Sequence, residues 1–150
     1  MVTIVGKINE KFLRSSEVYA VGLIKAGIII ADNEIAILGG GKIEMIASRK
    51  CIVAAIHKPL VLGNVYCNSI VAIGSRNPVA IGYLRADKLY ARKTYIDKLK
   101  VTEANLSELC VIGELEYAEK LTFMDPHLYI RKIGELRDVY YAYKPVDIGD

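Results

Sequence analysis

The sequence predicts an all-β protein whose chain winds into a β-solenoid, a stack of short coils in a single domain. Three observations lead to this prediction: apolar residues recur in steps of two and three, the pattern shifts phase only at turn residues, and one stretch of the chain aligns with a later one. An α-helix has apolar steps of three and four, and a half-buried strand has steps of two. Because neither pattern fits, we expect very short strands joined by frequent corners.

The spacing is most regular between residues 79 and 111. Thirteen of the fourteen positions in phase are apolar, and Thr94 is the exception. A step of two follows from the alternation of side chains along a strand, and a step of three leaves two residues for a corner. The residues expected to point inward are Val79, Ile81, Leu84, Ala86, Leu89, Ala91, Ile96, Leu99, Val101, Ala104, Leu106, Leu109 and Val111.

The same spacing occurs in two further runs. The N-terminal run consists of Tyr19, Val21, Ile24, Ala26, Ile29 and Ala31. The middle run, in which Lys50 and His57 are exceptions, consists of Met45, Ala47, Ile52, Ala55, Leu60, Leu62, Val65, Cys67, Ile70 and Ala72. The phase shifts between runs at ADNEIAILGGGK (31–42) and at GSRNP (74–78), where Gly, Asn and Pro favour longer corners.

An internal alignment sets the size of one coil. The stretch GNVYCNSIVA (63–72) aligns with GYLRADKLYA (82–91) at a shift of 19 residues. In a solenoid each repeat contacts only its neighbours, so this shift predicts one coil. Residues 19–111 then form about five coils.

The C-terminal part is less regular. Leu115, Leu121, Leu128 and Ile133 continue the strand pattern, and Tyr117, Phe123 and Ile130 accompany them. The alternative is a helix over residues 102–121 with Thr102 as its N-cap. Gly113 and the apolar run at 110–112 favour strands over this helix.

Composition narrows the class of protein. Apolar residues make up 53% of the chain, but no apolar stretch reaches the roughly 18 residues of a membrane span. The N-terminus does not read as a secretory signal, so we expect a cytoplasmic protein. The net charge of +3 is spread among both signs and gives no basic stripe for nucleic acid. Cys51, Cys67 and Cys110 are too far apart for a zinc or redox pair, and Cys67 is expected to point inward.

The repeats resemble those of the bactofilins, which are polymer-forming cytoskeletal proteins with a repeat of the form Gly-Asx-Ile-x-Ala-x-x-Val-x-Ile. The resemblance covers residues 22–111. The matching residues are Gly63, Asn64, Val65, Cys67, Ile70 and Ala72, and again Gly82, Leu84, Ala86, Leu89 and Ala91.

This resemblance implies a right-handed triangular β-helix of about six coils that stacks end to end into non-polar filaments without nucleotide, often on the inner membrane face. The chain departs from the family in having fewer corner glycines, no Pro-rich tails and no evident membrane-targeting segment in MVTIV. The five-residue step also resembles pentapeptide-repeat proteins, whose Ala-Asn-Leu hallmark occurs once, at 104–106. Most pairs here run large-then-small, the reverse of that hallmark.

The two ends of the solenoid are the candidate sites of self-association. The outer strands of a solenoid have unpaired edges that can pair with another copy, and a solenoid that acts alone covers them with polar caps. Here both ends are apolar or aromatic, so we expect assembly there, and the alternative is that these residues fold over their own core. The candidate residues are Val2, Ile4, Val5, Phe12 and Leu13 at one end, and Tyr140, Tyr141 and Tyr143 at the other.

Catalytic and ligand-binding interpretations find little support. His57 and His127 are the two histidines, and we expect His57 to occupy an inward slot or a corner rather than to bind a metal. LGGGK (38–42) lacks the spacing of a phosphate-binding P-loop, because Ala36 and Ile43 occupy two of its required positions. The outward Tyr83, Tyr90 and Tyr95 are expected to form a ladder on one face, with base stacking as the alternative.

We therefore expect a structural, non-enzymatic protein that binds other copies of itself through its ends, and no cofactor, metal, nucleic acid or small-molecule substrate. A membrane surface and scaffolded proteins are the further partners. The expected organisation is an end strand at 1–18, the solenoid at 19–137 and a short tail at 138–150. The alternative function is a non-polymerising solenoid scaffold that binds a protein partner.

Overall fold

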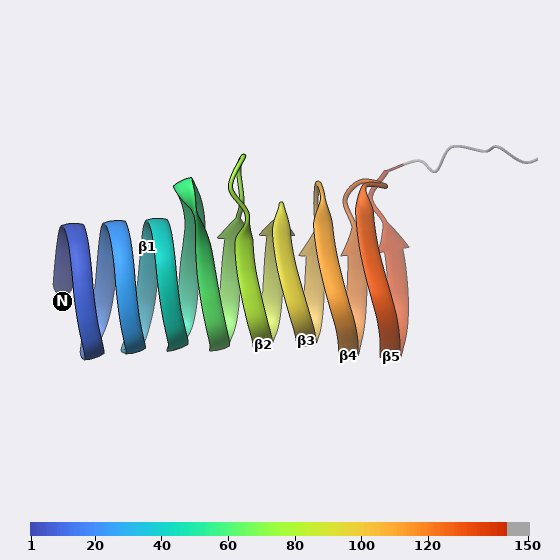
Figure 1. Ribbon diagram of the computed structural model, residues 1–150. Helices are drawn as coiled ribbons and strands as arrows, with labels where there is room; N and C mark the ends of the chain where they lie inside the picture. The colour runs from blue at the N-terminus through green and yellow to red at the C-terminus, as the bar shows by residue number, and fades with distance from the viewer. Residues whose placement is uncertain (144–150) are drawn as a thin grey trace, which may run out of the picture.

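The computed structural model describes residues 1–143, and these form an all-β structure with no helix among them. The chain winds as a right-handed β-solenoid, with its N-terminus at one end of the rod and the last strand at the other (Figure 1). All five strands belong to one parallel sheet in sequence order. The strands are β1 (Val2–Ile73), β2 (Val79–Arg92), β3 (Thr94–Leu106), β4 (Cys110–Phe123) and β5 (Leu128–Tyr141).

Strand β1 itself winds through several coils. A straight strand of its 72 residues would span about 240 Å, whereas β1 turns back over itself. A Cβ added to Gly22 would lie 1.9 Å from the Gly6 carbonyl oxygen, and one added to Gly39 would lie 1.8 Å from that of Gly22. These glycines therefore stack directly in successive coils, and their positive φ angles give the sharp corners.

The register between later strands defines the coil length. Leu60 pairs with Val79 at a separation of 19 residues, and Val79 pairs with Thr94 at a separation of 15. Strand β4 is offset from β3 by 16 to 17 residues, and β5 is offset from β4 by 18. The internal alignment of 63–72 with 82–91 is thus confirmed as one coil, and the corners absorb the variation in coil length.

The core is filled by the inward residues of each short strand segment. Every position predicted to be inward from Val79 to Leu106 is buried, including Thr94, which is the one buried polar residue within residues 1–143. The Thr94 hydroxyl, which has one hydrogen to donate, lies within hydrogen-bond distance of the carbonyls of Arg92 (2.9 Å) and Ala72 (3.3 Å). A polar residue can occupy this slot because the neighbouring coil supplies an acceptor.

The predicted phase is wrong beyond Leu106. Leu109 is 56% exposed and Val111 is 38% exposed, whereas Cys110 and Ile112 fill the core. The corner between β3 and β4 is longer than the regular step allows, so the following side chains change faces. The helical alternative for 102–121 is wrong as well, because this segment belongs to β3 and β4.

Smaller phase errors occur at the start of the N-terminal run and after the glycine-rich segment 31–42. Val18 and Ala20 are buried where Tyr19 and Val21 were expected, and Val21 is 46% exposed. Met45, Ala47 and Ile52 are half-buried. In that region the core is formed by Ile43, Ile46, Cys51 and Val53.

The predicted tyrosine ladder is wrong. Tyr83 aligns with Asn64 and Lys98, Tyr90 aligns with Val71 and Asn105, and Tyr95 aligns with Ala80 and Val111. The three tyrosines therefore lie in three different columns of the rod.

The observed solenoid extends beyond its expected limits, which were residues 19 and 137. It starts at Val2, so the expected end strand is the first coil, and β5 continues to Tyr141. Residues 144–150, the last part of the expected tail, lie outside the described residues.

Candidate functional site

In the last coil of the solenoid, apolar side chains at inward positions are partly exposed. Ile133 of β5 aligns with Leu115 of β4, and Val139 aligns with Leu121. Leu115 and Leu121 are fully buried, whereas Ile133 is 52% exposed and Val139 is 38% exposed. No strand within residues 1–143 covers β5, so the core ends in an open apolar layer. We call the inward residues of this last coil the C-terminal layer: Leu128, Ile130, Ile133, Leu136, Val139 and Tyr141.

Two of the three predicted C-terminal tyrosines extend this layer. Tyr141 aligns with Phe123, and their ring centres are 5.4 Å apart. Tyr143 meets Tyr141 edge to face at 5.8 Å, a favourable aromatic geometry. Tyr140 instead lies on the side of the rod, where the Lys120 ammonium is 4.9 Å from its ring centre.

The N-terminal end has a matching aliphatic layer. Because Gly22 stacks on Gly6, the first coil is offset from the second by 16 residues. The inward residues of the second coil are all at most 2% exposed, and they are Val18, Ala20, Ile24 and Ile29. Each lies 16 positions after an inward residue of the first coil. We call the half-buried inward residues of the first coil the N-terminal layer: Val2, Ile4, Ile8 and Leu13.

The remaining N-terminal candidates point elsewhere. Val5 is 80% exposed and Phe12 is 55% exposed. They alternate with Ile4 and Leu13, so they project from the side of the first coil.

Sequence reasoning missed six members of the two layers, namely Ile8, Leu128, Ile130, Ile133, Leu136 and Val139. The strand pattern includes Leu128, Ile130 and Ile133, but it does not place them at the end of the rod. The coil-to-coil offset is the signal that identifies these residues. Each of them follows or precedes a buried apolar residue by one coil.

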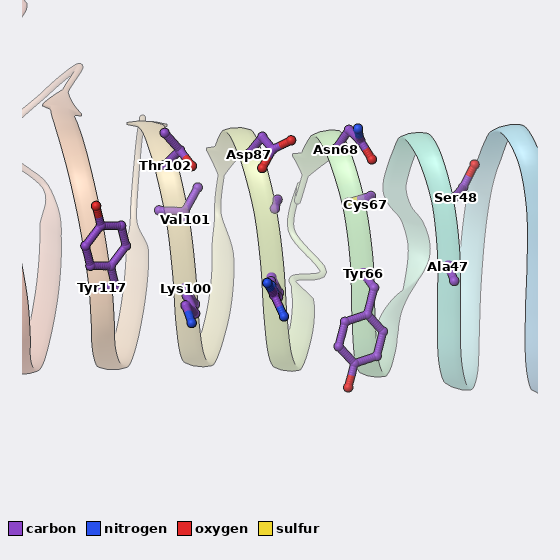
Figure 2. A pocket seen from close by; sticks show the side chains of 12 residues that line it. Ala47, Ser48, Tyr66, Cys67, Asn68, Asp87, Lys100, Val101, Thr102 and Tyr117 are labelled. Carbon is purple, nitrogen blue, oxygen red and sulfur yellow. The ribbon is translucent and has the colours of Figure 1, made fainter.

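A groove of about 490 Å³ lies on one side of the rod, across successive coils. Figure 2 shows Tyr66, Lys100 and Tyr117 along it, with polar corner residues such as Asp87 at its edge. Arg85 aligns with Tyr66 and Lys100 in neighbouring coils. Within residues 1–143 neither Arg85 nor Lys100 forms an ion pair. The groove therefore offers two free cations between aromatic rings to an extended partner segment.

The histidines and the glycine cluster occupy corners. His57 is exposed, not inward, and has a φ of 65°. His127 is also exposed and lies near Asp125 at the corner before β5. Gly39, Gly40 and Gly41 pack against backbone or side-chain atoms of neighbouring coils, which accounts for them structurally. Among the described residues no group of three or more His, Cys, Asp or Glu side chains has a metal-binding arrangement.

No family model, curated protein or solved structure matches the chain. Within residues 1–143 there is no helix that could cross a membrane.

Proposed function

We propose that this protein is a structural, non-enzymatic solenoid that assembles end to end into filaments without nucleotide. The observation that carries the proposal is the pair of uncovered apolar layers at opposite ends of the rod. A coil of another copy placed on either layer would continue both the core and the strand pairing. The resemblance of the repeats to bactofilins supports the same function.

The driving force for such assembly is the burial of the two layers. Full burial of an Ile or Val side chain contributes about 1.5–3 kcal/mol, and Ile133 and Val139 are still substantially exposed. The strand edges of the first and last coils would also gain hydrogen-bond partners. Joining unlike ends keeps the strands parallel, whereas joining like ends pairs them antiparallel.

The first prediction concerns the purified protein in negative-stain microscopy with no nucleotide added. We expect thin filaments, because both ends offer an apolar layer and a free strand edge. Ile133→Asp and Ile4→Asp should each abolish filaments, since each places a charge in one layer. The matched control is Asn105→Asp, which adds the same charge to an exposed side position of β3.

Light scattering on the two single variants identifies which ends meet. If unlike ends join, each single variant is a monomer, because every junction needs both layers. If like ends join, each single variant is a dimer, and only the double variant is a monomer. Circular dichroism of the strand type must be retained in the variants. Discrete particles of the unmodified protein at all concentrations contradict the proposal.

The alternative is a non-polymerising scaffold that binds a protein through its side. The groove between Tyr66 and Tyr117 favours this function, because its free cations suit an acidic, extended segment. Absence of filaments, together with retained solenoid structure, would leave this alternative as the better account.

A further inference from the structure

One side of the rod carries an apolar column that the end-to-end proposal does not use. Outward side chains in successive coils align in the order Val61, Ala80, Tyr95, Val111 and Tyr129. All are apolar or aromatic, and the two tyrosines are 49% and 59% exposed. They line an open groove of about 650 Å³. An exposed apolar surface that continues over several coils is typical of an interaction site.

The other outward columns differ in character. The column of Tyr66 continues with Arg85, Lys100, Tyr117 and Glu135 and is largely charged. A second column, formed by Val71, Tyr90, Asn105, Thr122 and Tyr140, is uncharged but contains the polar Asn105 and Thr122. The apolar column differs from both, because every member is aliphatic or a tyrosine.

A strained leucine extends the apolar column at β4. Leu109 adopts a φ of 53° at the corner before Val111 and is 56% exposed. Positive φ is unfavourable for a branched apolar residue, and here the Leu109 amide donates to the His127 carbonyl at 2.7 Å. The coil of β4 thus presents two exposed aliphatic side chains, Leu109 and Val111.

Charged residues flank the column with opposite signs on either side of β4. Asp97 lies one coil before Gly113, since a Cβ on Gly113 would meet the Asp97 backbone and its carboxylate. Arg131 lies one coil after Gly113, because the flanking pairs Ile112–Ile130 and Glu114–Lys132 fix the register. Within residues 1–143 neither Asp97 nor Arg131 forms an ion pair.

We infer that the apolar column pairs side by side with the same column of a second copy of this chain, with the two rods antiparallel. A two-fold axis that passes through Val111 parallel to β4 relates the apolar column of one copy to the apolar column of the other. Val111 then meets Val111 of the second copy, and Tyr95 meets Tyr129. Asp97 meets Arg131 in two symmetric ion pairs.

The charges select this register and orientation. An axis through Tyr95 would oppose Asp97 to its own counterpart, which is unfavourable. Parallel rods would oppose Asp97 to the corner of Lys93, whose ammonium already lies 3.9 Å from Glu108. The antiparallel pair is the arrangement that gives both unpaired charges a partner.

The pair is expected to be weak in isolation. Overlap of β3, β4 and β5 covers only about 14 Å along the rod, which is small for a stable interface. In filaments the contact would recur with every copy, and multivalency would strengthen it. The inference itself does not need filaments, so it is tested on the Ile4→Asp/Ile133→Asp variant, whose ends are blocked.

Cysteine crosslinking tests the geometry. In the end-blocked variant, Val111→Cys should crosslink to itself with a short bismaleimide. Tyr95→Cys and Tyr129→Cys should not crosslink alone, but an equimolar mixture of the two should. Tyr90→Cys, in a different column and with the same native cysteines, is the matched control. Self-crosslinking of Tyr95→Cys would overturn the antiparallel arrangement, and no crosslink above the Tyr90→Cys control in any sample would overturn the pairing.

Charge reversal provides a second, independent test. Asp97→Arg and Arg131→Asp should each weaken the pair by about tenfold or more in sedimentation equilibrium, because each creates two like-charge contacts. The double variant should restore the affinity to within about threefold, since both ion pairs reform with reversed sign. Both substitutions are at exposed positions, so the fold should be retained. A double variant no tighter than the single ones would overturn the inference.

Discussion

Strands β4 and β5 carry apolar residues at the same positions of their coils, but their side chains meet different surroundings. Leu115 in β4 is fully buried, whereas Ile133, its partner one coil later, is 52% exposed. The sequence pattern of the two strands is similar, and the difference arises because β5 covers β4, whereas no strand within residues 1–143 covers β5. In a solenoid the position in the stack, as much as the residue type, decides whether an inward side chain stabilises the monomer or is available for assembly.

The largest expected effect is the contrast between these two positions. Leu115→Ala should lower the free energy of unfolding by about 2–5 kcal/mol, because it leaves a cavity between two coils. Ile133→Ala should lower it by less than about 1 kcal/mol, since much of that side chain is already in water. Urea denaturation of both variants, at a protein concentration at which light scattering shows monomers, measures the difference. Equal losses would mean that another part of the molecule covers β5.

The second comparison uses glycines at the same corner of successive coils. Gly22 has φ +136°, and an added Cβ would lie 1.9 Å from the Gly6 carbonyl oxygen. Gly6 has φ +108°, but no atom lies within 4 Å of its added Cβ. Gly6→Ala should therefore cost about 1 kcal/mol from backbone strain alone. Gly22→Ala should cost about 2 kcal/mol more, because the coils must also move apart.

Thermal unfolding of the two alanine variants measures this contrast. A comparable loss for both would show that φ strain dominates and that the close stacking of coils at this corner contributes little.

The regular part of the fold was predictable from the sequence because strand alternation and short corners fix each step. From Val79 to Leu106 the expected inward positions are all buried, and the 19-residue internal alignment is one coil. The prediction failed at Leu109 and Val111, because spacing does not reveal how many residues a longer corner contains. A single added corner residue exchanges the inward and outward faces of all that follows.

The candidate ends were only partly predictable. Composition identified Val2, Ile4 and Leu13, but it did not separate them from the outward Val5 and Phe12. That separation requires the offset between the first and second coils, which Gly6 and Gly22 reveal only in three dimensions. The apolar column could not be found either, because its members are outward residues that align only once each coil length is known.

The last prediction concerns the thiols in the covered coils. Burial raises the pKa of Cys110, and backbone hydrogen bonds only partly oppose this. A hydrogen bond to Cys67, together with burial, raises the pKa of Cys51. Both thiols are buried.

Because both folded-state pKa values are raised, the protonated thiols contribute stability that is fully present below the unfolded-state pKa of about 8.5. Above that pH the unfolded chain loses protons that the folded chain retains, so stability falls by up to about 1.4 kcal/mol per pH unit for each thiol. Urea denaturation between about pH 8.5 and 9.5 should show this slope in the unmodified chain and a flatter one in Cys51→Ala/Cys110→Ala. Equal slopes would mean that water reaches these thiols, and the coils around them would then be less tightly closed than the contrast between β4 and β5 requires.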